Sequence, residues 1–176
     1  MHGLRNSLLA LALLAGAAPA FAFEISSSSV SDGKWANRYV ADKIAGCGGG
    51  NVSPALTWKD APAATKSFAL TLFDPDAPSG TGFWHWQVWN IPANVSGFKE
   101  GKVPSAAVQG KGDIGRTGYL GPCPPPGTGA HHYKFTLYAM SVDKLGLNPD
   151  TASVASISDA LNAKAIAKAT AVYAGQ

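Results

Sequence analysis

The chain has 176 residues and carries 14 Lys and Arg against 11 acidic residues, so its formal net charge is only +3. A balance this close to neutral creates no long-range field for polyanions, and no run of five or more basic residues occurs, which argues against nucleic acid as a partner. The length suits one domain with a sizeable core once a short leader is removed.

The first 22 residues have the three-part pattern of a secretory signal peptide. The segment Met1–Ser7 carries one Arg and no acid, residues 8–15 are an unbroken apolar run, and Ala20-Phe21-Ala22 is a small-x-small cleavage site. The run is too short for a comfortable membrane span, and no other segment is long and apolar enough. We predict cleavage after Ala22, a single domain at 23–176, no transmembrane segment, and a periplasmic or secreted location. A disordered apolar N-terminus is the alternative.

Two cysteines, Cys47 and Cys123, remain after cleavage. Disulfides form and persist in an oxidising compartment, so we expect these two residues to pair. Closing a loop of that length would stabilise the chain by roughly 4–5 kcal/mol, an upper figure from the loop-entropy model. The alternative is two free buried thiols.

The first half of the predicted domain contains short strands and one glycine loop. Residues 23–30 alternate weakly and predict a half-exposed first strand. Residues 35–44 predict a strand or turn, whereas residues 46–51 must be a loop because their Gly residues cost too much backbone entropy elsewhere. A short strand at 56–58 precedes residues 66–73, which are apolar on both faces and predict a strand in the middle of a packed sheet.

The second half contains two longer predicted strands, at 83–91 and 132–141, separated by a loop at 103–119 that carries four Gly. Loops of this length in compact domains are usually functional or mobile. The first of these strands is rich in aromatic residues. Strict alternation assigns its residues to two faces: Trp84, Trp86, Val88 and Asn90 on one, and Phe83, His85, Gln87 and Trp89 on the other.

The C-terminal segment predicts a helix over Ile157–Lys168 and a last short strand at 171–173. The residues Ser156 to Asp159 match a Ser-x-x-acid capping pattern, and apolar residues follow at helical spacing. The predicted fold class is therefore mainly β: an antiparallel β-sheet or sandwich with long Gly/Pro loops at one end and a C-terminal helix.

Two carboxylates follow the predicted central strand. Asp74 and Asp76 are separated by Pro75, with Pro78 just after, so the pair sits on a stiff turn. These carboxylates could accept hydrogen bonds from a ligand or orient a neighbouring His. Alternatively they serve only the turn, since Asp favours turns for its own backbone contacts.

Two of the three His residues in this region are candidates for the same site. His85 lies within a strand and needs a partner if buried, which either Asp could supply; the alternative is a satisfied core His. His131 shares a strand face with Tyr133, whereas His132 points the other way and is expected to be ordinary surface. Two Asp, two His and a Tyr at strand ends are the kind of convergent polar set that marks a small-molecule site.

The loop at 121–130 is rich in Gly and Pro. Gly lets backbone N–H groups approach a ligand closely, and a concavity of N–H groups attracts anions. Its Pro residues supply no N–H and can only shape the walls. An anion held by loop N–H groups and a protonated His131 is chemically reasonable at mildly acidic pH.

The sequence gives little support for an enzymatic function. No Gly-x-Ser-x-Gly elbow is present, and a zinc site from His85, His131 and Asp74 lacks the usual ligand spacing. Glycoside hydrolysis is disfavoured because Asp74 and Asp76 are too close in sequence on a Pro-fixed turn. We predict no catalytic residue, no metal and no cofactor, and keep a cryptic hydrolase using Asp76 and His85 as a remote alternative.

Four motifs occur in order between Asn51 and Tyr138. They are Asn51-Val52-Ser53-Pro54-Ala55-Leu56-Thr57-Trp58, Asp74-Pro75-Asp76-Ala77-Pro78, the strand from Trp84-His85 to Asn90-Ile91-Pro92, and Gly121-Pro122-x-Pro124-Pro125 leading through Gly127 to His131-His132-Tyr133. At these residues the chain resembles the phosphatidylethanolamine-binding protein family, also called the Raf kinase inhibitor protein family, in its bacterial branch.

The resemblance implies a fold around a large antiparallel sheet with a small anion pocket at one end. Carried over, the pocket comprises Asp74, Asp76, His85, Pro125, His131 and Tyr133, with Gly121 and Cys123 in the bordering loop. Two departures stand out: His132 occupies a position where many relatives carry Arg, which removes a positive charge, and Cys123 replaces a frequent Gly. If Cys123 pairs with Cys47, the preceding Gly-rich loop is tied to the site.

The resemblance also implies a function. Family members act mostly as binders and as modulators of kinases, proteases or signalling, and bacterial relatives are often dimers. The leading hypothesis is non-catalytic binding of a small anion or of a phosphorylated or phospholipid-headgroup ligand, with modulation of another protein as an extension. The alternative is a protein inhibitor of a protease or kinase that acts through the pocket rim. The predicted location makes a Raf-like kinase an implausible partner, and a homodimer is a further expectation.

Overall fold

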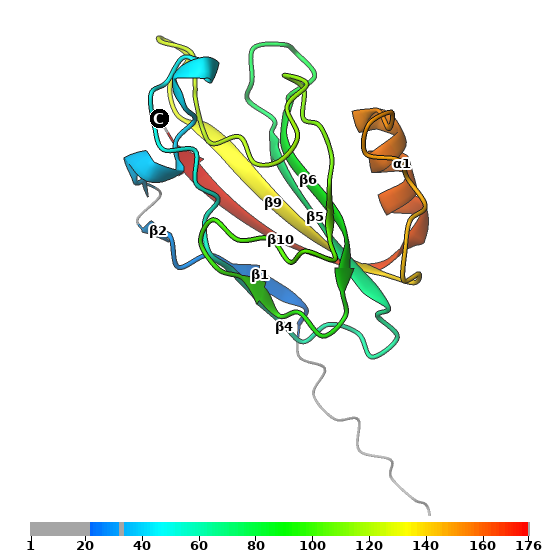
Figure 1. Cartoon of the computed structure of the whole chain (residues 1–176). Helices are drawn as coiled ribbons and strands as arrows, with labels where there is room; N and C mark the ends of the chain where they lie inside the picture. Colours follow the sequence, from blue (N-terminus) through cyan, green and yellow to red (C-terminus); the bar gives the residue numbers. More distant parts are fainter. Residues whose placement is uncertain (1–21, 32–33, 176) are drawn as a thin grey trace, which may run out of the picture.

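A computed structural model describes residues 22–31 and 34–175, whose regular secondary structure is mainly β-strand (Figure 1). Its elements in chain order are β1 (Glu24–Ser26), β2 (Val30–Ser31), β3 (Lys34–Trp35), the 3-10 turns η1 (Asn37–Tyr39) and η2 (Lys43–Ala45), β4 (Leu56–Lys59), β5 (Ser67–Asp74), β6 (Phe83–Pro92), β7 (Gly97–Phe98), β8 (Val108–Gln109), β9 (His131–Met140), α1 (Val154–Lys164) and β10 (Ala165–Gly175). The predicted signal peptide lies outside the described residues except for Ala22.

The strands form one large and two small antiparallel sheets. The large sheet has the order β10-β9-β5-β6-β8, a smaller one has the order β1-β4-β7, and β2 pairs with β3. Figure 1 shows α1 and the β1–β4 pair on opposite sides of the large sheet. The mainly β, antiparallel architecture confirms the predicted fold class.

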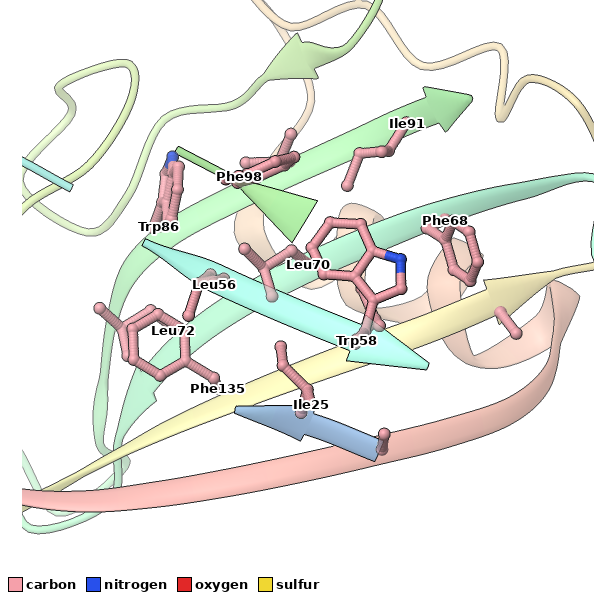
Figure 2. Close-up of a cluster of buried hydrophobic side chains, with 14 of the residues drawn as sticks. Ile25, Leu56, Trp58, Phe68, Leu70, Leu72, Trp86, Ile91, Phe98 and Phe135 are labelled. Atoms are coloured by element: carbon pink, nitrogen blue, oxygen red, sulfur yellow. The ribbon is translucent and has the colours of Figure 1, made fainter. Parts of the chain in front are cut away.

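The main core lies between the large sheet and the β1-β4-β7 sheet (Figure 2). Leu70 and Leu72 of β5 and Trp86 of β6 are fully buried there against Leu56 of β4. A second cluster joins the other face of the large sheet to α1 through Trp89, Tyr138, Met140, Ile157 and Leu161. The strand β5 is therefore covered on both faces, as its uninterrupted apolar sequence predicts.

The C-terminal prediction was wrong in its boundaries. The helix begins at Val154, one residue after Ser153, whose hydroxyl accepts a hydrogen bond from the backbone N–H of Ser156 (3.1 Å). It ends at Lys164, and the next 11 residues form β10, which pairs with β9 along its whole length. Pairing with β9 outweighs the helical propensity of an Ala-rich segment, because propensity is a weak determinant when tertiary contacts are available.

Other short elements also differ from their predicted extents. The first strand covers only Glu24–Ser26 instead of 23–30. Residues 35–44 contain η1 and the start of η2, in agreement with the turn alternative predicted there. The predicted loop at 103–119 is a loop apart from the two residues of β8, which pair with β6. The strands predicted at 56–58, 66–73, 83–91 and 132–141 are present, with bounds shifted by one residue or so.

A β-bulge in the β5–β6 pair decides where His85 points. Trp84 pairs with Phe73 and Trp86 pairs with Leu72, so His85 is the extra residue between two pairs. Trp86 joins the main core, whereas the Trp84 ring packs on Phe73 and borders a hollow beside α1. The prediction that Trp84 and Trp86 share a face was wrong, because a bulge inserts one residue and interrupts the alternation.

Candidate ligand pocket

A cavity of about 310 Å³ lies where the ends of β5, β6 and β9 meet three loops. These loops gather at one end of the large sheet (Figure 1). Three polar side chains, Asp74, His85 and His131, form what we call the polar corner. A second group of lining residues, which we call the loop wall, comprises Ala45, Ile114, Leu120, Cys123 and Pro125. The remaining lining residues are Ala77, Pro78, Ser79 and Phe83.

Asp74 is the centre of the polar corner. It is the last residue of β5 and only 3% exposed. Because β5 and β9 are hydrogen-bonded neighbours, the end of β5 lies beside the start of β9, and Asp74 Oδ2 is 2.7 Å from His131 Nδ1. Its other oxygen, Oδ1, accepts from the backbone N–H of Asp76 at 2.9 Å. A buried carboxylate needs such partners, since leaving it unpaired would be costly.

His85 enters the polar corner from the β6 bulge. Its Nδ1 is 3.1 Å from the carbonyl oxygen of Leu120, and its Nε2 is 4.0 Å from Asp74 Oδ2. Burial lowers the pKa of His85 to about 4, although the nearby Asp74 carboxylate and the Leu120 and Gly121 carbonyls favour the charged form. Desolvation outweighs these contacts, so the imidazole is neutral at neutral pH. The hydrogen-bond partner of His85 is therefore the Leu120 carbonyl and not, as predicted, an Asp side chain, although Asp74 lies nearby.

Thr128 completes the arrangement, and it was absent from the predicted site. Its Oγ1 is 2.8 Å from His131 Nε2 and donates to the carbonyl of Pro125 at 2.8 Å. Both ring nitrogens of His131 are thus engaged, one by Asp74 and one by Thr128. The local signal was a Thr three residues after a Pro, because a Thr hydroxyl can bond the backbone carbonyl three residues earlier in the chain.

The cysteines form the predicted disulfide between Cys47 and Cys123, with their Cα atoms 5.8 Å apart. The bond connects the glycine loop after η2 to the residue that lines the cavity beside Pro125. The Cys123 Sγ also lies 3.4 Å from the carbonyl oxygen of Ala45, a second member of the loop wall. The loop wall is therefore linked covalently to a neighbouring segment, as the sequence predicted.

Three of the predicted pocket residues do not line the cavity. Asp76 is largely exposed and bonds outside it: its Oδ2 accepts from the backbone N–H of His132 and lies 2.7 Å from His132 Nδ1. The side-chain bond from His132, followed by the backbone bond, lowers the pKa of Asp76. His132 is exposed as expected, but it also hydrogen-bonds to the Asp76 carboxylate, so it is not an ordinary surface residue.

Tyr133 and Gly121 do not line the cavity but pack against the residues that do. The Tyr133 ring is fully buried and meets the His85 ring edge-on at 5.3 Å between centroids. Burial raises the pKa of Tyr133. A Cβ on Gly121 would collide with the backbone of Tyr39, and the Gly121 N–H donates to Asn51 Oδ1 at 2.9 Å. These two residues position the polar corner and the loop wall.

Sequence reasoning also missed the apolar lining supplied by the loop at 103–119 and by Leu120, the residue that follows it. Ile114 lines the cavity while remaining 43% exposed, and Leu120 closes it beside His85. The loop is held by Asp113, whose Oδ2 accepts from the backbone N–H of Trp84 at 2.8 Å, and by an Arg116–Asp42 ion pair at 3.0 Å. The expectation that a loop of this length is functional or mobile did not identify these residues.

Comparison with known proteins identifies the family. The family model described as phosphatidylethanolamine-binding protein matches residues 26–174. This chain belongs to the phosphatidylethanolamine-binding protein family. It is 43% identical over 172 residues to UPF0098 protein YbcL of Escherichia coli K12, covering 93% of each chain. It is also 43% identical over 129 residues to UPF0098 protein YbhB of the same strain, covering 69% of this chain and 80% of that one.

Solved structures agree with the family assignment. The crystal structure of E. coli YbcL, described as a new member of the mammalian PEBP family, superposes with a TM-score of 0.81 at 40% identity. The match covers 88% of this chain and 98% of YbcL. Both the family and the fold predicted from the four motifs are therefore confirmed.

The described part of the chain contains no helix long and apolar enough to cross a membrane. Within the same residues, no group of three or more His, Cys, Asp and Glu is arranged to hold a metal ion. His85, His131 and Asp74 do converge, but only His131 and Asp74 are hydrogen-bonded to one another. In this member of the phosphatidylethanolamine-binding protein family, Asp74 and His131 satisfy one another.

Proposed function

We propose that this member of the phosphatidylethanolamine-binding protein family is a non-catalytic binding protein. Its pocket takes a small anion or a phosphorylated ligand, such as a phospholipid headgroup. The observation that carries the proposal is the buried polar corner at the end of an otherwise mainly apolar cavity of about 310 Å³. Small-molecule sites typically combine apolar walls with a few convergent polar groups.

The lining residues indicate how such a ligand is recognised. Within the described part of the chain, no Lys or Arg lines the cavity, and the ionisable side chains that do are one Asp and two His. Recognition therefore depends on hydrogen bonds in a desolvated corner, where each bond is stronger than in water. The predicted direct contact between an anion and His131 is not available in this arrangement, because Asp74 and Thr128 occupy both ring nitrogens.

The first test is a thermal shift assay with inorganic phosphate and phosphoryl-headgroup compounds. We expect the wild-type protein to gain stability on binding, since a ligand that binds only the folded state raises the melting temperature. The change His131→Ala should abolish the shift, because Asp74 loses its partner and becomes an uncompensated carboxylate in the pocket. His132→Ala, one residue away but exposed, is the matched control and should keep the shift.

Absence of a shift with every anion in a broad screen would contradict the binding proposal. The non-catalytic part is tested separately, by incubating the protein with a panel of phospho- and carboxyl-ester substrates. If the wild-type protein hydrolyses a substrate and His85→Gln does not, the protein is a hydrolase and the non-catalytic proposal is wrong.

We further propose that residues 1–22 are a cleaved signal peptide and that residues 23–176 act as a single domain in the periplasm or outside the cell. The Cys47–Cys123 disulfide supports this location, because such bonds are rare in reducing compartments. N-terminal sequencing of the mature protein should give Phe23 as the first residue. Recovery of the full-length chain from the cytoplasm would contradict the proposal.

A second candidate function is inhibition of a protease or kinase through the pocket rim. It is favoured by Ile44, which is 82% exposed and adjoins Ala45 of the loop wall. Measured inhibition should then fall in Ile44→Ser, whereas Val172→Ser, an exposed residue on β10, should leave it unchanged. Light scattering on the same samples would show whether the protein is a homodimer.

A further inference from the structure

The orientation of His85 determines what the pocket offers a ligand. A carbonyl oxygen can only accept, so the contact between His85 Nδ1 and the Leu120 carbonyl requires the hydrogen to be on Nδ1. In the neutral ring, Nε2 then carries a lone pair. That nitrogen faces Asp74 Oδ2 at 4.0 Å, which is too long for a hydrogen bond.

The polar corner therefore contains two acceptors that face one another, and none of the described side chains that line the cavity places a donor between them. His85 is 5% exposed and Asp74 is 3% exposed, so neither acceptor is well solvated. His131 cannot serve as the donor, because its Nδ1 is bonded to Asp74 and its Nε2 to Thr128. A ligand oxygen without a hydrogen would meet two lone pairs and would be repelled at close range.

The other charged and titratable groups nearby do not reverse this pattern. Tyr133 packs against the His85 ring edge-on, and its hydroxyl, although able to donate, belongs to a residue that does not line the cavity; Asp113 adds further negative charge at longer range. Among the described residues, no Lys or Arg lines the cavity. The neutral form of His85 is maintained by its burial, with a pKa of about 4.

We propose that the pocket selects anions that carry their own hydrogen-bond donor, and that it places this donor between His85 Nε2 and Asp74 Oδ2. Phosphate monoesters with a P–O–H group and phosphoryl compounds with an ammonium group have this chemistry. Sulfate and simple phosphodiesters do not. The inference rests on the proposed function, because it concerns the ligand of the same pocket. Sites built with buried acceptors discriminate strongly against analogues that lack the donor, whose binding leaves those acceptors unpaired.

The test compares four probes by calorimetry at pH 5.5. Methyl phosphate retains its P–O–H hydrogen at this pH, since the second pKa of a phosphate monoester is about 6. Glycerophosphoethanolamine is a diester that carries an ammonium group instead. Dimethyl phosphate and sulfate carry neither donor. We expect the two donor-bearing probes to bind about 10- to 100-fold more tightly than the two without a donor.

A pH series separates the two kinds of donor. Raising the pH to 8 removes the hydrogen of methyl phosphate, so its affinity should fall. The ammonium group of glycerophosphoethanolamine stays protonated, so its affinity should change little. If only one of the two probes binds at pH 5.5, that result assigns the donor as P–O–H or N–H and still supports the proposal.

Two variants test the assignment of the acceptors. Asp74→Asn and His85→Gln each introduce an amide that can donate, so sulfate should bind more tightly and the discrimination should shrink about tenfold or more. Thermal melts establish that each variant folds, and His132→Gln is the exposed control that should keep wild-type discrimination. Equal binding of all four probes would overturn the inference and leave the proposed function intact. No binding of any probe would overturn both.

Discussion

The polar corner and the loop wall enclose the same cavity but are stabilised in different ways. Asp74, His85 and His131 stand on hydrogen-bonded strands of one sheet, and their positions follow from strand register and one bulge. The loop wall belongs to segments with little regular structure, joined by the Cys47–Cys123 disulfide. The difference suggests that the corner determines the chemistry of the site and the disulfide determines its shape.

The largest effect is expected when the disulfide that joins the loop wall to its neighbouring segment is removed. Replacing both Cys47 and Cys123 by Ser should reduce the free energy of unfolding by roughly 4 kcal/mol, since the loop closed by the bond spans 76 residues. Chemical denaturation with and without reductant measures this loss, and the double variant should no longer respond to reductant. We expect the sheet to persist in far-UV circular dichroism while the ligand-induced thermal shift weakens. A reduced wild-type protein of unchanged stability would show that the loop wall does not depend on the bond.

The polar corner should instead respond to pH through His85. Its folded-state pKa of about 4 lies below the unfolded value of about 6.5, so the unfolded chain binds more protons between these values. Stability should therefore rise as pH increases through this window, by up to about 3 kcal/mol, and be lost on acidification. Urea denaturation at pH 4.5, 5.5 and 6.5 measures the slope. His85→Gln should lack this contribution, and an identical slope in the variant would exclude His85 as its source.

The smallest expected effect concerns Thr128, which connects the two regions. Thr128→Val removes the hydroxyl that joins His131 to the Pro125 carbonyl. We expect a loss of about 1 kcal/mol in the free energy of unfolding and a weaker ligand-induced shift, because the loop is no longer held against the corner. Thr128→Ser retains the hydroxyl and should resemble the wild type. If Val and Ser variants behave alike, the polar corner and the loop wall are independent.

Local sequence signals identified most of the strands and loops that surround the cavity, but not the geometry of the cavity. The apolar run of β5, the aromatic run of β6 and the alternation of β9 were all recognisable, and so were the Gly/Pro loops. Asp74, His85, Cys123, Pro125 and His131 were each predicted and line one cavity. Their role in ligand binding is still a prediction. The C-terminal boundaries failed because an Ala-rich segment satisfies helix propensity and strand pairing alike.

The amino-acid sequence alone determined the family, the mainly β class and the cysteine pair, because motifs, hydrophobic periodicity and residue chemistry are local properties of the chain. Only the tertiary structure decided that Asp74 enters the pocket while Asp76 turns outward to His132. It also decided that a bulge turns His85 toward Asp74. The physical reason is that strand register and bulges depend on pairing between distant segments, and one inserted residue changes which side chains share a face.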